Sequence, residues 1–120
     1  MSDAPKPVGP YTPVVRAGDW LVVSGQVGLA TGGLVAGGVE AELRQAIANL
    51  RAQLATAGAT LEDVVKTTVF LRHMPDYGRM NELYIEAFGD HRPARSAVAV
   101  AELPLGALFE IEAWAHRARS

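Results

Sequence analysis

Alternating apolar and polar positions near the start of the chain predict a β-hairpin. Tyr11–Arg16 and Trp20–Gln26 are rich in β-branched and aromatic residues, and the turn-forming pair Gly18-Asp19 lies between them. The following stretch, Val27–Gly38, is rich in glycine, which favours turns over regular structure. We therefore expect an exposed connection between this hairpin and the next element.

Two later segments have apolar residues at three- and four-residue steps, which predicts amphipathic helices. The first covers Val39–Ala57 and is followed by Gly58, a residue type that commonly ends a helix. The second has Pro75 in its first turn and Gly89 after its last turn. Its apolar stripe consists of Tyr77, Met80, Tyr84, Ala87 and Phe88.

Three further segments predict strands: Val64–Arg72, Arg95–Ala101 and Leu108–Ala118. The last two flank a turn at Pro104–Gly106. The resulting order β-β-α-β-α-β-β describes an α+β fold that occupies residues 1–120 as a single domain. Because right-handed crossovers return to the same side of a sheet, both helices are expected on one face.

The opposite face of the predicted sheet has no helix to cover it. Alternation places one set of residues of the last strand under the helices: Phe109, Ile111, Ala113 and Ala115. The open face receives a second set of residues: Glu110, Glu112, Trp114, His116, Ser24, Gln26, Arg95, Ala97 and Ala99. This assignment holds if the alternate positions of the other strands also point inward, namely Leu21, Val23, Gly25, Ser96, Val98 and Val100. Because Trp20 and Val22 lie on the open face too, this face is too apolar to remain in water, and we expect self-association.

Composition limits the possible functions. The 120 residues are 49% apolar and 20% charged, with a net charge of −2 and no cysteine, which excludes disulfides, thiolate catalysis and cysteine-ligated metals. Lys and Arg are thinly spread, which argues against a nucleic-acid partner. No apolar stretch approaches the roughly 20 residues that span a bilayer, and Met1–Val8 does not have the pattern of a signal peptide. We therefore expect a cytoplasmic protein without a membrane partner.

Metal and nucleotide motifs are missing from the sequence. His73, His91 and His116 have no ligand-like spacing, so each is expected at the surface or in a satisfied interior position. The chain has no Gly-x-Ser-x-Gly elbow, phosphate-binding loop or dinucleotide fingerprint. We therefore predict that the site contains no metal.

Two charged residues differ from their apolar surroundings. Arg95 begins a predicted strand, where its planar guanidinium could hold a carboxylate through two parallel hydrogen bonds, although an ordinary surface ion pair would also account for it. Glu110 lies in an otherwise apolar strand, and burying a carboxyl group without a partner is unfavourable. It therefore either lines a cavity or faces another subunit.

Short motifs from about Pro7 to Ala115 resemble the RidA (YjgF) family. In chain order they are Gly9-Pro10-Tyr11, Ser24-Gly25-Gln26, Asn49, residues 63–71, Asn81 with Tyr84, Pro93-Ala94-Arg95-Ser96, Leu103-Pro104 and Glu110-Ile111-Glu112-Ala113. The resemblance implies a chorismate-mutase-like fold of the bacillary type that assembles as a trimeric barrel. It also implies a homotrimer with three sites in the clefts between subunits, which agrees with the open apolar face.

Proteins of this family hydrolyse reactive 2-imino acids and their enamine tautomers to 2-keto acids and ammonia without a cofactor. The resemblance therefore implies a 2-iminobutanoate/2-iminopropanoate deaminase in which Arg95 binds the substrate carboxylate and Glu110 orients or activates water. The other implied substrate contacts are Tyr11, Ser24, Asn81 and backbone groups near Ala97. An imine is already electrophilic, so positioning and a proton path would suffice.

The chain departs from the family pattern at three places. Ala97 stands where many members have Cys, Pro13 replaces a common Gln, and the loop before Arg95 is a few residues shorter. The shorter loop bears most on side-chain specificity. In addition, a simple hairpin of the last two strands would place Arg95 opposite a residue near His116, away from Glu110.

Two other functions stay open on the sequence alone. The protein could be a non-catalytic module that binds small carboxylates or a protein partner, in which case Glu110→Gln would change nothing measurable. It could instead be an endoribonuclease or translation inhibitor, although the acidic balance argues against RNA. The deaminase hypothesis is distinguished by its requirement for Arg95.

Overall fold

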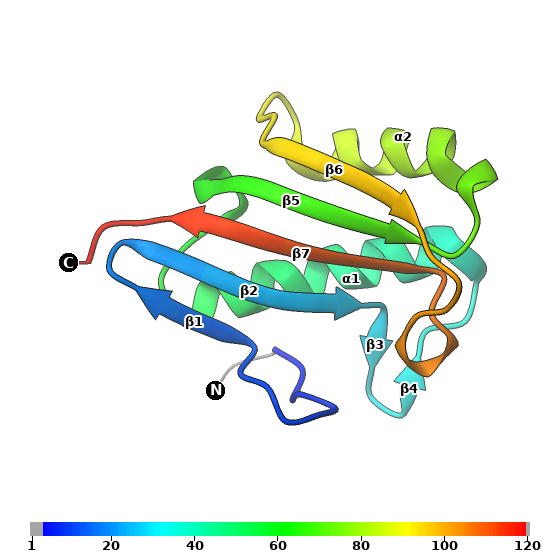
Figure 1. Ribbon diagram of the computed structural model, residues 1–120, viewed down its shortest axis with the longest axis horizontal. Helices are drawn as coiled ribbons and strands as arrows, with labels where there is room; N and C mark the ends of the chain where they lie inside the picture. Colours follow the sequence, from blue (N-terminus) through cyan, green and yellow to red (C-terminus); the bar gives the residue numbers. More distant parts are fainter. Residues whose placement is uncertain (1–3, 120) are drawn as a thin grey trace.

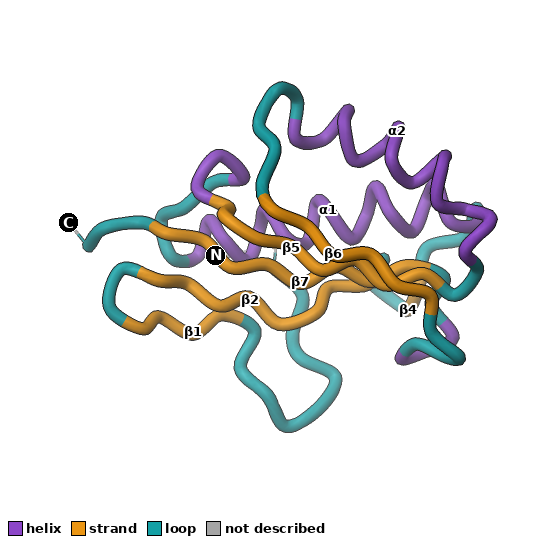
Figure 2. Tube along the Cα trace, turned by 45° about the horizontal axis from the view of Figure 1, so that its top comes forward, coloured by secondary structure: helices purple, strands orange, loops and turns teal. Residues whose placement is uncertain are grey.

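Two helices pack against one face of a five-stranded sheet, as Figure 1 and Figure 2 show. The computed structural model describes residues 4–119, so residues 1–3 of the leader lie outside the described residues. The elements are β1 (Val14–Ala17), β2 (Trp20–Val27), β3 (Leu29–Ala30), β4 (Gly33–Leu34), α1 (Gly38–Thr56), β5 (Val64–Leu71), α2 (Tyr77–Phe88), β6 (Ala94–Ala99) and β7 (Phe109–His116). The predicted α+β class is confirmed, and so is the element order apart from β3 and β4.

The strand order in the sheet is β1-β2-β7-β5-β6, which places the last strand of the chain in the middle. β7 pairs antiparallel with both β2 and β5, whereas β6 pairs in parallel with β5 at the edge. α2 is the crossover between the parallel strands β5 and β6. Because β5 separates β6 from β7, these two strands form no hairpin, and the register that would put Arg95 near His116 does not occur.

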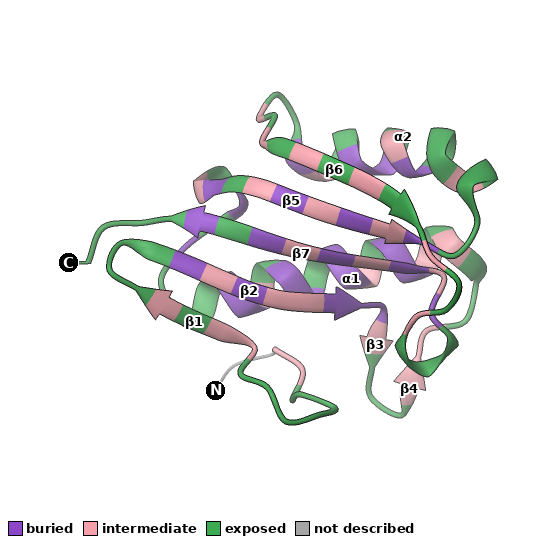
Figure 3. Cartoon of the chain, viewed as in Figure 1, coloured by how far each residue is buried: buried purple, intermediate pink, exposed green. Residues whose placement is uncertain are grey.

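Side chains on the helical side of the sheet form the hydrophobic core. The residues of β7 predicted to point inward are fully buried, which confirms that prediction: Phe109, Ile111, Ala113 and Ala115. Leu43, Leu50 and Leu54 of α1 pack into the same core and are at most 1% exposed. Figure 3 shows the resulting alternation of buried and less buried positions along β5 and β7. A one-residue slip would move every one of these side chains to the other face, so burial fixes the register.

A small two-stranded ribbon occupies the glycine-rich connection, where the sequence predicts no regular structure. β3 and β4 pair antiparallel, and Gly32 and Gly33 at their turn have φ values of 91° and 134°. Glycine adopts this region without strain, so the glycines that predict a loop form a hairpin turn instead. The buried Asn49 joins the ribbon to α1, because its Nδ2 donates to the carbonyls of Val27 and Leu29, each at 2.9 Å.

A β-bulge in β2 reverses the predicted faces of two residues. Ser24 and Gly25 both lie opposite Glu112, so β2 carries one extra residue at this point. Beyond the bulge, Gln26 is 5% exposed and lies on the helical side, although alternation assigns it to the open face. Gly25 lies on the open face beside Glu110, although alternation assigns it to the interior. An isolated glycine within a strand is itself a signal for a bulge.

The face predicted for β6 is wrong. Arg95 aligns with Thr67 of β5, which is fully buried on the helical side. Aligned residues of neighbouring strands point to the same face, so Arg95, Ala97 and Ala99 face α2 while Val98, 42% exposed, lies on the open face. Hydrophobicity could not separate the two sides of this edge strand, because the open face is itself apolar.

Candidate functional site

The carboxyl group of Glu110 lies in a hollow on the open face of the sheet. This hollow, called the Glu110 hollow below, has a volume of about 200 Å³ and is lined by Val8, Tyr11, Ser24, Gly25, Val27, Pro104 and Glu110. Its walls come from the chain before β1, the bulge in β2, the turn before β7 and β7 itself. Three of the predicted site residues, Tyr11, Ser24 and Glu110, are thus brought together within one chain.

The bulge in β2 leaves room for the Glu110 carboxyl group. A Cβ atom on Gly25 would lie 2.5 Å from Oε2 and 2.8 Å from Cδ of Glu110, which is closer than van der Waals contact. The other bulge residue, Ser24, donates its hydroxyl to the Thr12 carbonyl at 2.7 Å. This hydrogen bond holds the segment that carries Tyr11 against β2.

The surroundings of Glu110 favour its neutral form. Burial raises the pKa of Glu110 above its ordinary value of 4.5, and the negative charge of Glu112 raises the pKa further. Within residues 4–119 no group donates a hydrogen bond to this carboxyl. A poorly solvated carboxylate without a partner is well suited to accept a proton from water.

A second hollow lies between α2 and the start of β6. This hollow, called the Arg95 hollow below, has a volume of about 370 Å³ and is lined by Asn81, Tyr84, Ile85, Arg92, Pro93 and Arg95. α2 supplies one wall, and the segment that enters β6 supplies the other. Two more predicted site residues, Asn81 and Arg95, therefore meet here.

Aromatic and sulfur groups of α2 hold the guanidinium of Arg95. Its Nη2 donates to the hydroxyl of Tyr77 at 3.1 Å, and its Nη1 lies 3.8 Å from Sδ of Met80. The guanidinium carbon lies 4.9 Å from the centroid of the Tyr84 ring, within cation–π range. The ion pairs among residues 4–119 do not include Arg95. An ordinary surface ion pair therefore does not account for this residue, and its remaining N–H groups are free for an anion.

Asn81 and Ala97 differ in what they offer. Oδ1 of Asn81 is buried and accepts no hydrogen bond from any of the described residues 4–119. A buried acceptor without a donor is unfavourable, so this atom could receive an N–H group of a ligand. Ala97 lies in neither hollow and packs against the core. Its possible contribution is limited to the backbone of β6, which is an edge strand with one unpaired side.

Within one chain, Arg95 and Glu110 point to opposite faces of the sheet. Arg95 aligns with Thr67 on the helical face, whereas Glu110 aligns with Phe70 on the open face. The structure thus groups five of the six predicted site residues into two sets, each in its own hollow, and leaves Ala97 outside both. A single chain does not bring the predicted catalytic pair together.

The sequence pattern assigned Tyr77 and Tyr84 to the apolar stripe of α2 and missed their contacts with Arg95. Their seven-residue spacing corresponds to two helical turns, so both rings lie on the face of α2 that meets β6. Burial raises the pKa of Tyr84, while a hydrogen bond with Thr67 at 2.8 Å and the positive charges of Arg95 and Arg92 act in the opposite direction. No sequence signal pointed to Arg92, which lines the same hollow.

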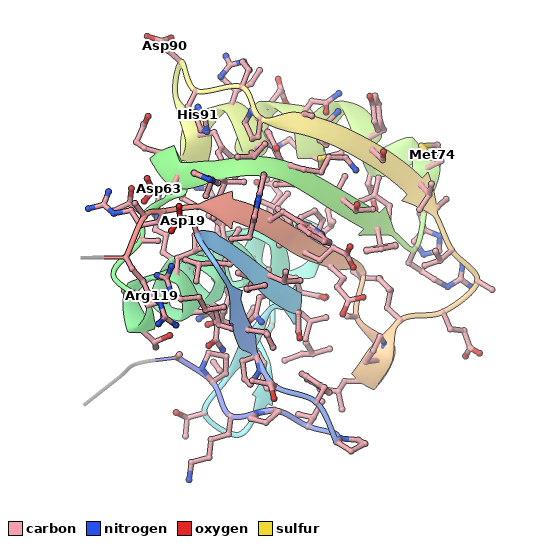
Figure 4. All side chains as sticks on the ribbon, turned by 60° about the vertical axis from the view of Figure 1, so that its left-hand side comes forward. Asp19, Asp63, Met74, Asp90, His91 and Arg119 are labelled. Carbon is pink, nitrogen blue, oxygen red and sulfur yellow. The ribbon has the colours of Figure 1, made fainter. Side chains whose placement is uncertain are left out.

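His91 and His116 contact backbone and aromatic groups. Nε2 of His91, labelled in Figure 4, lies 2.7 Å from the Val64 carbonyl oxygen, and the His116 ring packs edge-on against Trp20 with centroids 4.9 Å apart. Residues 4–119 contain no cluster of three or more His, Cys, Asp or Glu side chains that could hold a metal. In the same range, no helix combines the length and apolar character needed to cross a membrane.

The fold and the two hollows define a class: a small α+β protein with a guanidinium that has no acidic partner within residues 4–119 and a separate carboxyl group with raised pKa. The sequence matches the family model described as "Endoribonuclease L-PSP" over residues 1–117. The chain belongs to this family, which is the RidA (YjgF) family of the sequence resemblance.

Known proteins are similar along nearly the whole chain. A RutC family protein from Pyrococcus horikoshii is 45% identical, with 96% of this chain and 93% of that protein covered. The 2-iminobutanoate/2-iminopropanoate deaminase of Mus musculus is 47% identical, with 92% and 83% covered. The crystal structure of RidA from an Antarctic Psychrobacter species has a TM-score of 0.92 at 36% identity, with 97% of this chain and 95% of that chain covered.

Proposed function

We propose that this protein hydrolyses reactive 2-imino acids, and their enamine tautomers, to 2-keto acids and ammonia. The observation that carries the proposal is the guanidinium of Arg95, which borders a hollow and has no acidic partner among residues 4–119. Such a group is suited to the carboxylate that every 2-imino acid carries. The name of the mouse relative supports the same reaction.

In the proposed reaction, Arg95 binds the α-carboxylate and Glu110 accepts a proton from a water molecule. The water oxygen forms a bond to C2, and the π electrons of the C=N bond move to nitrogen, which takes up a proton from solvent. In the resulting carbinolamine, Glu110 passes the proton that it took from water to the amino nitrogen. The C–N bond then breaks with its electron pair on nitrogen, ammonia leaves, and the hydroxyl proton passes to solvent as C=O forms. The raised pKa of Glu110 brings it closer to the operating pH for both transfers. No step uses a cofactor.

We further propose that the site forms between subunits of a homotrimer. Arg95 and Glu110 cannot act on one molecule within one chain, because they point to opposite faces of the sheet. An assembly in which the Arg95 hollow of one subunit meets the Glu110 hollow of the next would bring them together. The large apolar side chains on the open face support such an assembly, since Trp20 is 39% and Trp114 46% exposed.

The test measures keto-acid and ammonia release from 2-iminopropanoate and 2-iminobutanoate that a dehydratase generates in situ. The wild-type protein should accelerate release above the spontaneous rate, and Arg95→Ala should abolish that acceleration. Arg51→Ala is a matched control, because Arg51 also contacts α2, through the Ala87 carbonyl at 3.3 Å, but lines neither hollow. No acceleration by the wild-type protein, or full activity of Arg95→Ala, would contradict the proposal.

The variant Glu110→Gln and an RNA titration separate catalysis from the two alternative functions. A carboxylate-binding module would need Arg95 but would not respond to Glu110→Gln, whereas a deaminase would lose turnover and keep its affinity for keto acids. The description of the family model names endoribonuclease activity, so RNA binding should be titrated at two salt concentrations. The net charge of −2 predicts no salt-dependent signal.

A further inference from the structure

The Arg95 hollow contains a second arginine that the proposed reaction does not use. Arg92 lines this hollow three residues before Arg95. The ion pairs among residues 4–119 involve Arg44, Arg79 and Arg117, and neither Arg92 nor Arg95 has an acidic partner in that range. None of the residues that line the hollow is acidic. The hollow therefore has two positive groups and no negative one.

Backbone contacts hold Arg92 beside the end of α2. Its Nη1 donates to the carbonyls of Gly89 and His91. The N–H groups of these two residues in turn donate to carbonyls of the last turn of α2. A guanidinium has five N–H groups, so the other nitrogens keep donors for a ligand. The charges of Arg92 and Arg95 both act on the Tyr84 hydroxyl, which indicates that both reach the same side of α2.

If Arg95 holds the α-carboxylate through two parallel hydrogen bonds, a substrate with one carboxylate has no second anionic group for Arg92. An anion with a second acidic group could pair with both, and the hollow, at about 370 Å³, is within the size range of small-ligand sites. The segment that enters β6, with Arg92 and Pro93, forms one wall of the same hollow.

We propose that Arg92 is a specificity residue that favours substrates with a second carboxylate, namely the 2-imino acids derived from acidic amino acids. This inference rests on the proposed function: Arg95 binds the α-carboxylate, and Arg92 binds the carboxylate of the side chain. The hydrolysis itself is the one described above, since Arg92 touches neither C2 nor the attacking water. Arg92 thus acts on affinity rather than on the chemical step.

The test is a calorimetric titration with two unreactive keto acids at low salt. The wild-type protein should bind the dicarboxylate 2-oxoglutarate more tightly than the monocarboxylate 2-oxobutanoate. Arg92→Gln should weaken 2-oxoglutarate by roughly fivefold, as expected for one solvent-exposed ion pair, and leave 2-oxobutanoate unchanged. Arg92→Lys, which keeps the charge, should retain most of the preference. Added salt should reduce the preference, because the Debye length falls to about 8 Å at physiological ionic strength.

Arg51→Gln is the matched control, since it removes the same charge and also a contact with the end of α2, the Ala87 carbonyl. The inference is overturned if the wild-type protein binds both acids equally, or if Arg92→Gln and Arg51→Gln weaken both acids alike. Failure of the proposed function gives a different result: binding of both acids that survives Arg95→Ala would contradict the carboxylate contact itself. Turnover of the imino acid made from aspartate by an amino-acid oxidase should follow the same order as binding.

Discussion

Glu110 is half buried on β7, and both burial and the negative charge of Glu112 raise its pKa. The fold therefore holds this carboxyl group in a place that disfavours its charged form. The same surroundings increase the basicity that the proposed water activation needs. Stability and activity are thus expected to respond to this residue in opposite directions.

Glu110→Gln should lower kcat by roughly 100-fold or more and stabilise the folded protein at neutral pH. Because the folded pKa lies above the unfolded value, the stability linked to this group is fully present below the ordinary value of 4.5 and is lost as pH rises through the folded pKa. The gain in Tm of the variant should therefore disappear below pH 4.5. In the wild-type protein, activity should fall on acidification through the raised pKa, and Glu112→Gln should move that decline to lower pH. A variant less stable than wild type at neutral pH would contradict this account.

Tyr77 fixes the direction of the Arg95 guanidinium through its hydroxyl group, 3.1 Å from Nη2. Tyr77→Phe keeps the ring and removes only this acceptor, so KM for 2-imino acids should rise by about fivefold, the value of one hydrogen bond. kcat should change little, because Glu110 is untouched. Tyr84→Phe removes a hydroxyl that contacts Thr67 instead, and its effect should appear in thermal stability. Equal effects of the two variants on KM would show that Tyr77 has no special positioning role.

At the level of elements, the bulge in β2 couples strand geometry to the site. The extra residue turns both Ser24 and Gly25 toward the open face. One of them holds the segment before β1, and the other leaves space for Glu110. Any residue other than glycine at position 25 would place a side chain where the carboxyl group lies.

Gly25→Ala tests the bulge. The added Cβ would meet the mobile end of the Glu110 side chain, so stability should change by no more than about 1 kcal/mol. Activity should fall at least about tenfold, because the displaced carboxyl group no longer reaches its water. Gly78→Ala is the control: it lies in α2 with nothing within 4 Å of the added atom. Chemical denaturation and initial rates together would show whether activity and stability separate as expected.

The strand β7 and the helix α2 show which parts of the fold the sequence predicts. Core positions of β7 and most of the apolar stripe of α2 follow from periodicity, because only one side of each element is buried against other elements. Tyr77 is the exception in that stripe, since it is 39% exposed. The pattern fails at the bulge, which inverts alternation, and at β6, where both faces accept small or apolar side chains. One chain keeps the two hollows on opposite faces of the sheet. Only the family resemblance, and not geometry, therefore groups Tyr11, Ser24, Asn81, Arg95 and Glu110 into one predicted site.

At the scale of the whole molecule, the main feature is the apolar open face of the sheet, which no helix within residues 4–119 covers. Trp20 and Trp114 pack edge to face with centroids 6.2 Å apart, and Val98 adds a further exposed side chain on β6. Helices cover only the other face. The face has the apolar character of an interface between copies of this chain.

Trp114→Glu should convert the proposed trimer to monomers without unfolding the chain, because the side chain is 46% exposed in one chain. The new carboxylate would lie on the open face near Glu112, where like charges repel. Sedimentation velocity should show the loss of the trimer, circular dichroism should stay native, and deaminase activity should be lost. Met74→Glu, at an exposed position outside the sheet, should change none of these. A monomeric variant with full activity would contradict a site shared between subunits.

The placement of Arg95 and Glu110 on opposite faces also makes the two inactive variants complementary. If each site takes Arg95 from one subunit and Glu110 from its neighbour, co-expressed Arg95→Ala and Glu110→Gln chains should recover activity that neither has alone. In a randomly mixed cyclic trimer, about a quarter of the sites would contain both native residues. If both residues came from the same chain, mixing would restore nothing, because every site would carry one of the two defects.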